Sequence, residues 1–345
     1  MAPSSRTGRV KPSEVAAETK RYLIPMIREH YIRTHAHPPF STLYDNPLSQ
    51  LCIHRRIPGT RPPIFYFVAD DPVSTALSYA AKDTWASQAN GGPRIHVPFI
   101  CAANERRPGG DWETGCAGYE EKLCRRSNLS AILSTPKPGS KLPTHYPIPL
   151  DGAVFSNSVV VGRGPHDRYD RLDTWMDLPV VSVAPIRWPK LRDNGMHYSF
   201  RPERDIMINK MRGALRICLY HNYDRVVIGD FGLGNSCRNP PREMAEMWRD
   251  ILLFDPDIRG QFVYVIFAFE EPSQSTSRLI HDEIVKRERQ GSSRSMPHDT
   301  PLAPSSTATR FPTDMSIFQQ VFNPLEIERV LTAPDPRYGL NMITS

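Results

Sequence analysis

The sequence lacks a hydrophobic run long enough to cross a membrane. No stretch approaches the roughly 18 consecutive apolar residues that a transmembrane helix requires, so we expect no membrane contact. The first residues, MAPSSRTGRVKPSE, contain no apolar core of the kind found in signal peptides. Secretion through such a signal is therefore not expected, and an intracellular protein is predicted.

The cysteines lack the spacing of a zinc motif. The chain has six, at Cys52, Cys101, Cys116, Cys124, Cys218 and Cys237. No two of them have CxxC spacing, and no histidine lies at a zinc-motif distance. Without a secretory signal they are expected to be free thiols in a reducing compartment.

The chain carries only a small excess of positive charge. The chain has 43 Lys and Arg residues against 37 Asp and Glu, a formal net charge of +6. This balance suits an anionic ligand or polymer, but it is too small to indicate nucleic-acid binding by itself. An ordinary basic surface is the simpler explanation, and no direct readout of nucleic acid is expected.

Proline, in contrast, is abundant. The 34 prolines among 345 residues are about twice the ordinary share and imply long irregular segments. At roughly 100–200 residues per domain, the length allows one large domain with extensions, or two small domains.

Strand-like and helix-like patterns alternate between about residues 61 and 290. The predicted strands are 64–69, 97–102, 154–161, 180–185, 226–230 and 262–269. The predicted helices are 70–88, 115–134, 202–221, 240–254 and 275–289. This order predicts one α/β domain with a mixed, mostly parallel sheet.

Three further segments flank this domain. Residues 1–60 form an N-terminal extension with one predicted helix, from Ser13 to about Tyr31, followed by a Pro-rich connection. Residues 291–313 are rich in Ser, Thr and Pro and are predicted to be a flexible linker. The tail 314–345 carries a short helical apolar stripe, Ile317, Phe318, Val321 and Phe322. The stripe either docks on the domain or binds a partner, and docking is the commoner outcome.

The first chemically informative segment runs from Phe99 to Arg126. A strand is followed by Asn104, a Pro-Gly-Gly turn and a helix with two adjacent acids, Glu120 and Glu121. Adjacent side chains on a helix point about 100° apart, so one acid can face a cleft while the other supports it. The alternative is an ordinary loop and a helix whose acids are favoured near its start by the helix dipole.

The second segment joins a strand to a helix through a Gly-rich loop, Gly229–Gly234. Such a loop presents backbone N–H groups and a helix N-terminus to a phosphate. It is neither a Walker A loop nor a dinucleotide fingerprint, because the Lys and the third Gly spacing are missing. The alternative is a tight structural turn.

Together the two segments resemble the microbial-type poly(ADP-ribose) glycohydrolase family, a branch of the macrodomain fold. The family's Gly-Gly-Gly run and its Gln-Glu-Glu are matched by Gly109-Gly110-Asp111 and Tyr119-Glu120-Glu121. Asn104 matches the Asn of its Phe-Ala-Asn context, and Leu123–Ser127 matches its Leu-Cys-Arg-Arg-Ser. The late Gly-Ala-Trp-Gly-Cys-Gly loop and Asn-Pro are matched by Gly229–Gly234 and Asn239-Pro240. The resemblance covers about residues 60–270 and looks like a divergent, fungal-like branch.

The resemblance implies a three-layer α/β/α fold and hydrolysis of the ribose–ribose link of poly(ADP-ribose). Glu121 would be the general acid/base, and Glu120 would orient a ribose hydroxyl. Asn104 would bind the distal ribose, and Tyr119 would contact the substrate in place of the Gln. The diphosphate would be held by the backbone of Gly109, Gly110 and Asp111 and of Gly232, Leu233, Gly234, Asn235 and Ser236. No metal and no nicotinamide cofactor is implied.

Two alternatives stay open. One is an ADP-ribose reader without turnover, and the other is a hydrolase of a different ADP-ribose derivative. The family usually stacks adenine on a Phe shortly after its late loop, where this chain has Asn235-Ser236-Cys237, so no stacking residue is assigned. The implied partners are poly-ADP-ribosylated proteins, in the nucleus or cytoplasm, with a role in the DNA damage response.

Overall fold

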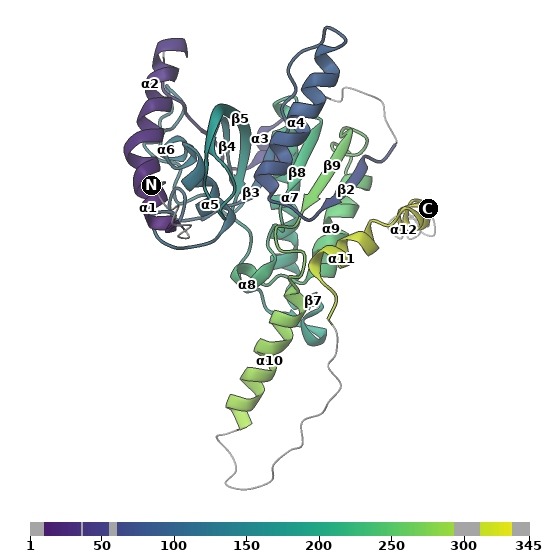
Figure 1. The fold of residues 1–345 in the computed structure, drawn as a ribbon. Coiled ribbons are helices and arrows are strands. Elements are labelled where there is room, and N and C mark those ends of the chain that lie inside the picture. Colours follow the sequence, from purple (N-terminus) through teal and green to yellow (C-terminus); the bar gives the residue numbers. More distant parts are fainter. Residues whose placement is uncertain (1–9, 36, 55–60, 293–310, 333–345) are drawn as a thin grey trace, which may run out of the picture.

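A seven-stranded mixed sheet lies at the centre of the fold (Figure 1). The computed structural model describes residues 10–35, 37–54, 61–292 and 311–332. In spatial order the strands are β1 (Thr42–Tyr44), β4 (Ala153–Arg163), β5 (Arg171–Val183), β3 (Phe99–Ala102), β8 (Arg225–Ile228), β9 (Tyr264–Ala268) and β2 (Ile64–Val68). The five strands from β5 to β2 are parallel, whereas β1 and β4 pair antiparallel. The predicted mixed, mostly parallel sheet is confirmed.

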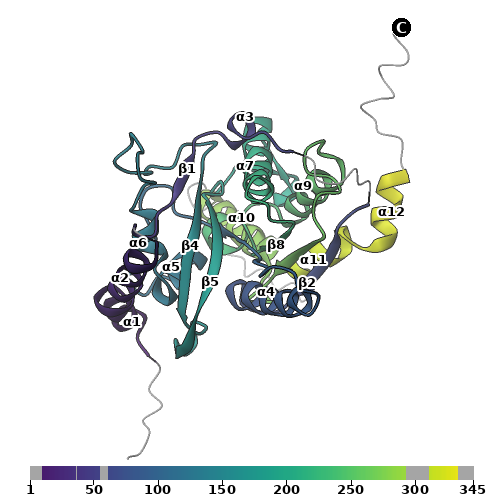
Figure 2. The same ribbon diagram turned by 90° about the horizontal axis from the view of Figure 1, so that it is seen from above.

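Helices cover both faces of the sheet (Figure 2). One face packs against α4 (Pro72–Gln88), α5 (Tyr119–Arg126) and α6 (Leu129–Leu133), and the other against α7 (Arg201–Tyr220) and α9 (Pro241–Phe254). Neighbouring residues of β8 go to opposite cores, with Val226 and Ile228 on the α7–α9 side and Val227 on the other. The chain is therefore a three-layer α/β/α protein with two hydrophobic cores.

Local capping explains where α4 begins. The Asp71 carboxylate accepts a hydrogen bond from the Ser74 backbone N–H at 2.8 Å, and Pro72 occupies the first helical turn. The same carboxylate pairs with Arg126 at 2.7 Å, at the end of α5. This buried pair connects the helix that follows β2 to the helix that carries the two adjacent glutamates.

Two predicted elements differ in the structure. The helix expected over 115–134 starts only at Tyr119, and an extended Ser127 separates α5 from α6. Strand β5 begins at Arg171, whereas the predicted strand began near residue 180. The prediction missed the first half of the strand because that half is largely exposed and polar and lacks an alternation of apolar residues. The strand forms a long antiparallel hairpin with β4.

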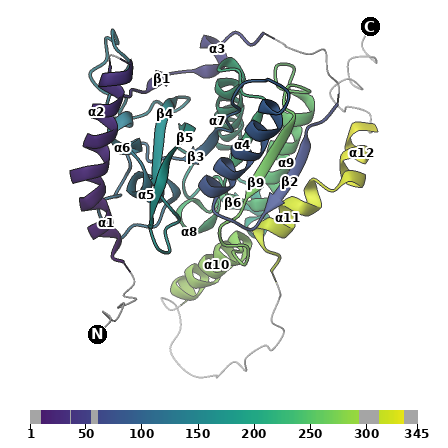
Figure 3. The same cartoon turned by 45° about the horizontal axis from the view of Figure 1, so that its top comes forward.

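The N-terminal extension packs beside β4 (Figure 3). Helix α1 (Pro12–Glu18), a π-helical turn (Thr19–Leu23) and α2 (Ile24–His35) follow each other without interruption. Thr19 is fully buried and its hydroxyl donates to the Arg125 carbonyl at 2.7 Å. Strand β1 then joins the sheet at its edge, and the short helix α3 (Pro47–Gln50) follows.

The C-terminal tail packs at the other end of the sheet, near β2 (Figure 3). Helix α10 (Thr276–Ser292) precedes it, and the tail forms α11 (Asp314–Val321) and α12 (Pro324–Thr332). The predicted stripe Ile317, Phe318, Val321 and Phe322 is buried in the core that contains α9. Residues 293–310, which hold most of the predicted linker, lie outside the described residues.

Within the described residues, no helix has the length and apolarity to cross a membrane. No group of three or more His, Cys, Asp and Glu side chains in that part of the chain could hold a metal ion. All six cysteines are unpaired.

Candidate active site

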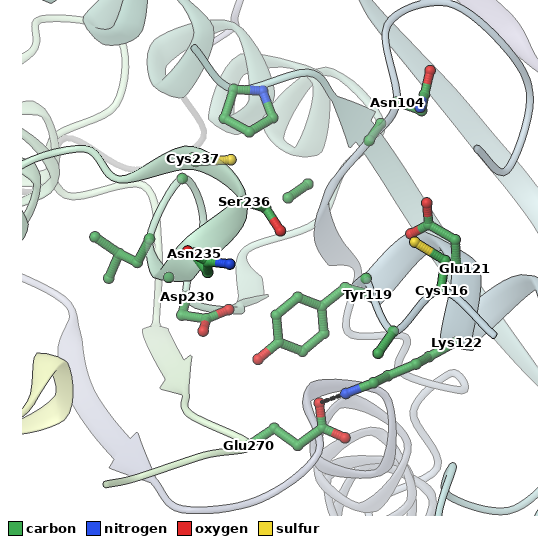
Figure 4. Close-up of a pocket in the computed structure, with 18 of the residues that line it drawn as sticks. Asn104, Cys116, Tyr119, Glu121, Lys122, Asp230, Asn235, Ser236, Cys237 and Glu270 are labelled. Carbon is green, nitrogen blue, oxygen red and sulfur yellow. Dashed lines mark hydrogen bonds and ion pairs between the residues drawn. The ribbon is translucent and has the colours of Figure 1, made fainter. Parts of the chain in front are cut away.

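A pocket of about 250 Å³ opens at the carboxyl ends of the parallel strands (Figure 4). This is where ligands bind in open α/β sheets. Nine of the twelve predicted site residues line it: Asn104, Asp111, Tyr119, Glu121 and the run Gly232–Ser236. Gly109, Gly110 and Glu120 lie outside the lining, and Gly118, which was not predicted, belongs to it. Nine predicted residues from two distant segments are thus brought together.

Glu121 lies in the first turn of α5, with its carboxylate against two glycines. A β-carbon on Gly110 would collide with Glu121 Oε1, and one on Gly118 would collide with Oε2. Gly110 also has a φ of +55°, which side-chain-bearing residues rarely adopt. The Asp111 N–H points at Oε1 from 3.4 Å. The Pro-Gly-Gly turn therefore encloses the carboxylate while leaving it at the pocket surface.

Glu120 lies directly behind the pocket and is 1% exposed. Its Oε2 accepts a hydrogen bond from the Asn104 backbone N–H at 2.6 Å, which ties the end of β3 to α5. Burial raises the pKa of Glu120 to about 8, with Glu121 adding to the rise and the Asn104 N–H opposing it. The two acids therefore occupy different environments, one buried and one at the pocket.

Asn104 has one polar group left for a ligand. Its Oδ1 accepts from the backbone N–H groups of Arg106 and Arg107 at 2.8 and 3.2 Å. Its Nδ2 lies beside Gly110, 3.3 Å from where a β-carbon would stand. The amide NH₂ thus shares the pocket floor with the Glu121 carboxylate.

A buried arginine fixes the loop that precedes α5. Arg125 is 1% exposed, and its guanidinium donates to the carbonyls of Trp112 and Thr114, both at 2.8 Å, and of Cys116. The Leu-Cys-Arg-Arg-Ser run is thereby explained. One of its arginines holds the loop that carries Asp111 and Gly118, and the other, Arg126, pairs with Asp71.

The Gly-rich loop leads into the short helix α8 (Gly234–Cys237). Gly232 and Gly234 have φ values of +77° and +71°. The fully buried Asn239 donates to the carbonyls of Gly232 and Ile186 at 2.7 and 2.8 Å, which explains the Asn-Pro that follows the loop. Gly234 N–H is taken by the Thr276 hydroxyl at 2.7 Å, whereas the next two residues of α8, Asn235 and Ser236, line the pocket.

The opposite wall of the pocket is acidic. The Tyr119 hydroxyl and the Asp230 carboxylate both line this wall, and Asp230 accepts a hydrogen bond from Gln274 Nε2 at 2.9 Å. Burial raises the pKa of Asp230 to about 6, and the nearby Tyr119 hydroxyl and Gln274 amide oppose the rise. Burial and the charges of Asp230 and Glu270 raise the pKa of the Tyr119 hydroxyl well above its ordinary value, so Tyr119 is neutral.

Glu270 neutralises a cation on the same wall. Lys122 Nζ lies 2.7 Å from its Oε2, and His166 Nδ1 lies 2.5 Å from its Oε1. Figure 4 shows the Lys122–Glu270 pair beside the Tyr119 ring. The Lys122 ammonium group is therefore already paired with a carboxylate of the protein.

Arg187 is a pocket-lining cation with no ion pair or hydrogen bond to another residue in the part of the chain that the structure describes. Its positive charge lowers the pKa values of Glu120 and Cys237, against larger effects of burial. The next residue, Trp188, has a φ of +54°, and its N–H donates to the Cys237 carbonyl at 2.7 Å. The Arg238 guanidinium lies 4.1 Å from the Trp188 ring centroid. The segment after β5 is therefore attached to α8 at the pocket rim.

Sequence reasoning did not assign Lys122, Arg187, Asp230, Glu270 or Gln274 to the site. A signal existed for two of them, because Asp230 ends one predicted strand and Glu270 directly follows another, and both strands are parallel in the structure. Arg187 follows β5, but the sequence around it contains no motif that identifies it as a site residue.

The family model described as microbial-type PARG, catalytic domain, matches residues 72–164. That range contains Asn104, Gly109–Asp111 and the Glu120-Glu121 pair. No curated protein sequence matches the chain. The chain's assignment to a fungal-like branch stays a prediction.

Solved structures of bacterial enzymes match most of the fold. Poly(ADP-ribose) glycohydrolase from Thermomonospora curvata has 19% sequence identity and a TM-score of 0.54, over 80% of this chain and 98% of that chain. The same enzyme bound to the inhibitor ADP-HPD gives 20% identity and a TM-score of 0.55 over the same shares. The Deinococcus radiodurans enzyme in complex with ADP-ribose gives 19% and 0.48, over 76% and 98%. At such identity the T. curvata matches show that this chain has the fold of those glycohydrolases, as predicted.

Proposed function

We propose that this protein is a poly(ADP-ribose) glycohydrolase that cuts ribose–ribose O-glycosidic bonds and releases ADP-ribose. The proposal rests above all on the Glu121 carboxylate, which lies at the pocket floor against Gly110 and Gly118. The family model that covers this motif supports it. The T. curvata matches add the fold of enzymes with that activity.

In this proposal Glu121 acts as general acid and then as general base. Glycoside cleavage passes through an oxocarbenium-like state and needs an acid on the leaving oxygen. The Glu121 proton goes to the 2′-oxygen as its bond to the neighbouring anomeric carbon breaks. A water then adds its oxygen to that carbon and returns a proton to Glu121.

The remaining pocket residues would hold the ligand. Asn104 Nδ2, the amide group left unused by the loop, is suited to a ribose hydroxyl. The amides of Asn235 and Ser236 and the Arg187 guanidinium are suited to the diphosphate. Glu120 would act from behind, by holding the end of β3 and the start of α5 together.

Two alternative functions are considered for the same site. The first is a reader that binds ADP-ribose without turnover, and the second is a hydrolase of another ADP-ribose derivative. They are prompted by the departures from the family pattern at Asp111 and Tyr119: Asp111 pairs with Arg107, and Tyr119 lines the pocket wall beside Asp230.

Product analysis separates the three. Automodified polymer incubated with the purified protein should yield free ADP-ribose, and Glu121→Gln should bind polymer but release nothing. A reader would bind and release nothing even as wild type. A protein that cleaves a mono-ADP-ribosyl adduct but leaves polymer intact would support the second alternative. ADP-ribose should raise the melting temperature in every case, so absence of any shift would contradict all three. Poly-ADP-ribosylated proteins as partners, and a nuclear or cytoplasmic location, remain proposals.

A further inference from the structure

A buried aspartate at the start of the C-terminal tail contacts the segment after β9. Asp314 is 1% exposed. Its Oδ1 accepts from the Thr276 N–H at 2.8 Å, and its Oδ2 accepts from the Thr276 hydroxyl at 2.6 Å and from Gln274 Nε2 at 3.0 Å. Its own N–H donates to the Gln274 carbonyl at 2.9 Å. One residue of α11 thus makes four hydrogen bonds to two residues of another segment.

The same two residues contact the pocket. The fully buried Thr276 hydroxyl accepts from Gly234 N–H at 2.7 Å, and Gln274 Nε2 also donates to Asp230 Oδ2 at 2.9 Å. Two short chains of hydrogen bonds therefore run from Asp314 to the ligand loop. One passes through Thr276 to Gly234, and the other passes through Gln274 to Asp230.

The donor and acceptor roles in these chains are set by Asp314. A hydroxyl has a single proton, and a carboxylate can only accept. Because the Thr276 proton goes to Asp314, the hydroxyl presents its lone pairs to Gly234. Likewise both amide protons of Gln274 are used by Asp230 and Asp314, so its Oε1 is the atom that lies against Gly234.

Docking of the tail does not need this carboxylate. Phe318 packs 5.1 and 5.3 Å from the rings of Phe267 and Phe269, centroid to centroid, and Ile317 and Val321 are also buried. Burying a charged group is costly unless its partners satisfy it. An apolar residue would serve a purely adhesive role better, so the network has a reason other than adhesion.

We propose that Asp314 is a positioning residue through which the C-terminal segment fixes the loop Gly232–Ser236 for the ligand diphosphate. The inference rests on the proposed function for the identity of that ligand. The coupling between Asp314 and the loop does not depend on the proposed function, because it concerns contacts within the protein alone. A tail residue separated from the pocket loop by about eighty positions thus completes the site.

The binding test uses the full chain and ADP-ribose. Asp314→Asn and Asp314→Ala should each weaken ADP-ribose affinity by about fivefold or more in calorimetry. KM for polymer should rise similarly while kcat changes less than about threefold, because Glu121 has no bond to this network. Val321→Ala is the matched control. It removes apolar contact from the same helix, so it should lower the melting temperature yet leave affinity unchanged. Equal affinity losses in Val321→Ala and the Asp314 variants would overturn the proposal.

A second pair of variants covers a failure of the Asp314 variants to fold. Thr276→Val keeps the shape but removes the hydroxyl that accepts from Gly234, whereas Thr276→Ser keeps it. The Val variant should lose affinity as the Asp314 variants do, and the Ser variant should retain it. Unchanged affinity in Thr276→Val would contradict the proposed path.

Amide hydrogen exchange on the ligand-free protein gives an independent readout. The Gly234 amide should exchange at least about tenfold faster in Asp314→Asn and Thr276→Val than in wild type, and Val321→Ala should leave it unchanged. If the wild type neither binds nor releases ADP-ribose, the proposed function fails, and faster exchange would still support the coupling. If the wild type is active and Gly234 exchange is unchanged in the variants, only the coupling fails.

Discussion

The Tyr119 hydroxyl and the Asp230 carboxylate face the same pocket, and burial together with the negative charge of Asp230 raises the pKa of Tyr119. The family pattern that this chain resembles has Gln and Ala at these two positions, so two departures from that pattern share one pocket wall. Gln274 Nε2 donates a hydrogen bond to Asp230, at 2.9 Å. The first turn of α5 and the loop after β8 therefore both make this wall polar.

Tyr119 is predicted to serve binding and not proton transfer. Tyr119→Phe keeps the ring in the pocket and leaves Asp230 its Gln274 partner, so it should retain most of the turnover number with a KM raised by about threefold to tenfold. Tyr119→Ala removes the ring as well and should lose more affinity. Steady-state kinetics on polymer tests this. A collapse of kcat in the Phe variant at unchanged affinity would instead make the hydroxyl catalytic.

Gly110 is predicted to be essential for turnover. An alanine at this position would place its β-carbon on the Glu121 carboxylate and would be strained at a φ of +55°. Gly110→Ala should lower kcat more than tenfold while the fold persists. Gly115→Ala is the control in the same loop, because a β-carbon there meets nothing within 4 Å. Similar kinetics in both alanine variants would mean that the turn does not position Glu121.

Arg187 is predicted to bind the anionic part of the ligand. Arg187→Ala should weaken ADP-ribose affinity by about tenfold, the scale of one charge-assisted hydrogen bond. Arg238→Ala is the comparison at the same rim, since that guanidinium is already engaged with the Trp188 ring, Asn235 and Glu283. Affinity that depends on salt in the wild type and much less in Arg187→Ala would support the assignment. Unchanged affinity in Arg187→Ala would contradict it.

Glu120 is predicted to make stability fall as pH rises. Its pKa is about 8 in the folded protein, against 4.5 as the reference value. Between these values the folded state keeps the proton while the unfolded state releases it, so rising pH favours unfolding. The contribution of Glu120 is therefore fully present below about pH 4.5 and is lost as pH rises through 8.

The variant Glu120→Gln tests this, because it cannot titrate and its amide oxygen can still accept from Asn104. The stability of wild type relative to the variant should fall by more than about 1 kcal/mol between pH 5 and pH 8.5. Other buried groups titrate in both proteins and cancel in the difference. A difference in unfolding free energy between wild type and Glu120→Gln that stays constant across this pH range would show that Glu120 is not buried as a protonated acid.

Local signals in the sequence identified most of the scaffold and the heart of the site. Asp71-Pro72 marked the start of α4, and apolar runs marked β2, β3, β8 and β9 within a few residues. The acid pair and the Gly-rich loop were found because each is a short contiguous pattern. Which of the two acids faces the pocket was not readable from spacing, since it depends on how α5 rotates against β3.

The parts that were missed depend on contacts between distant segments. Asp314 comes from a different segment than Gln274 and Thr276, and none of the three has a distinctive local pattern. The first half of β5 is polar and largely exposed, so the sequence predicted a strand before Arg187 that is too short. Such features follow from the tertiary arrangement and not from propensity or periodicity.

Glu121 carries the sharpest prediction. Glu121→Gln keeps the volume and can still accept from the Asp111 N–H, but it cannot donate a proton to a leaving oxygen and recover it from water. Loss of general acid/base work costs about 10²–10⁴ in rate. Binding should survive, because the proposed contacts to the diphosphate come from Asn235, Ser236 and Arg187. The variant should therefore bind polymer with near-wild-type affinity and release ADP-ribose at least a hundredfold more slowly, at roughly the lower bound of that range. Glu120→Gln should be impaired less, since Glu120 acts from behind the pocket through Asn104. Release of ADP-ribose by Glu121→Gln at a rate close to wild type would show that another group supplies the proton.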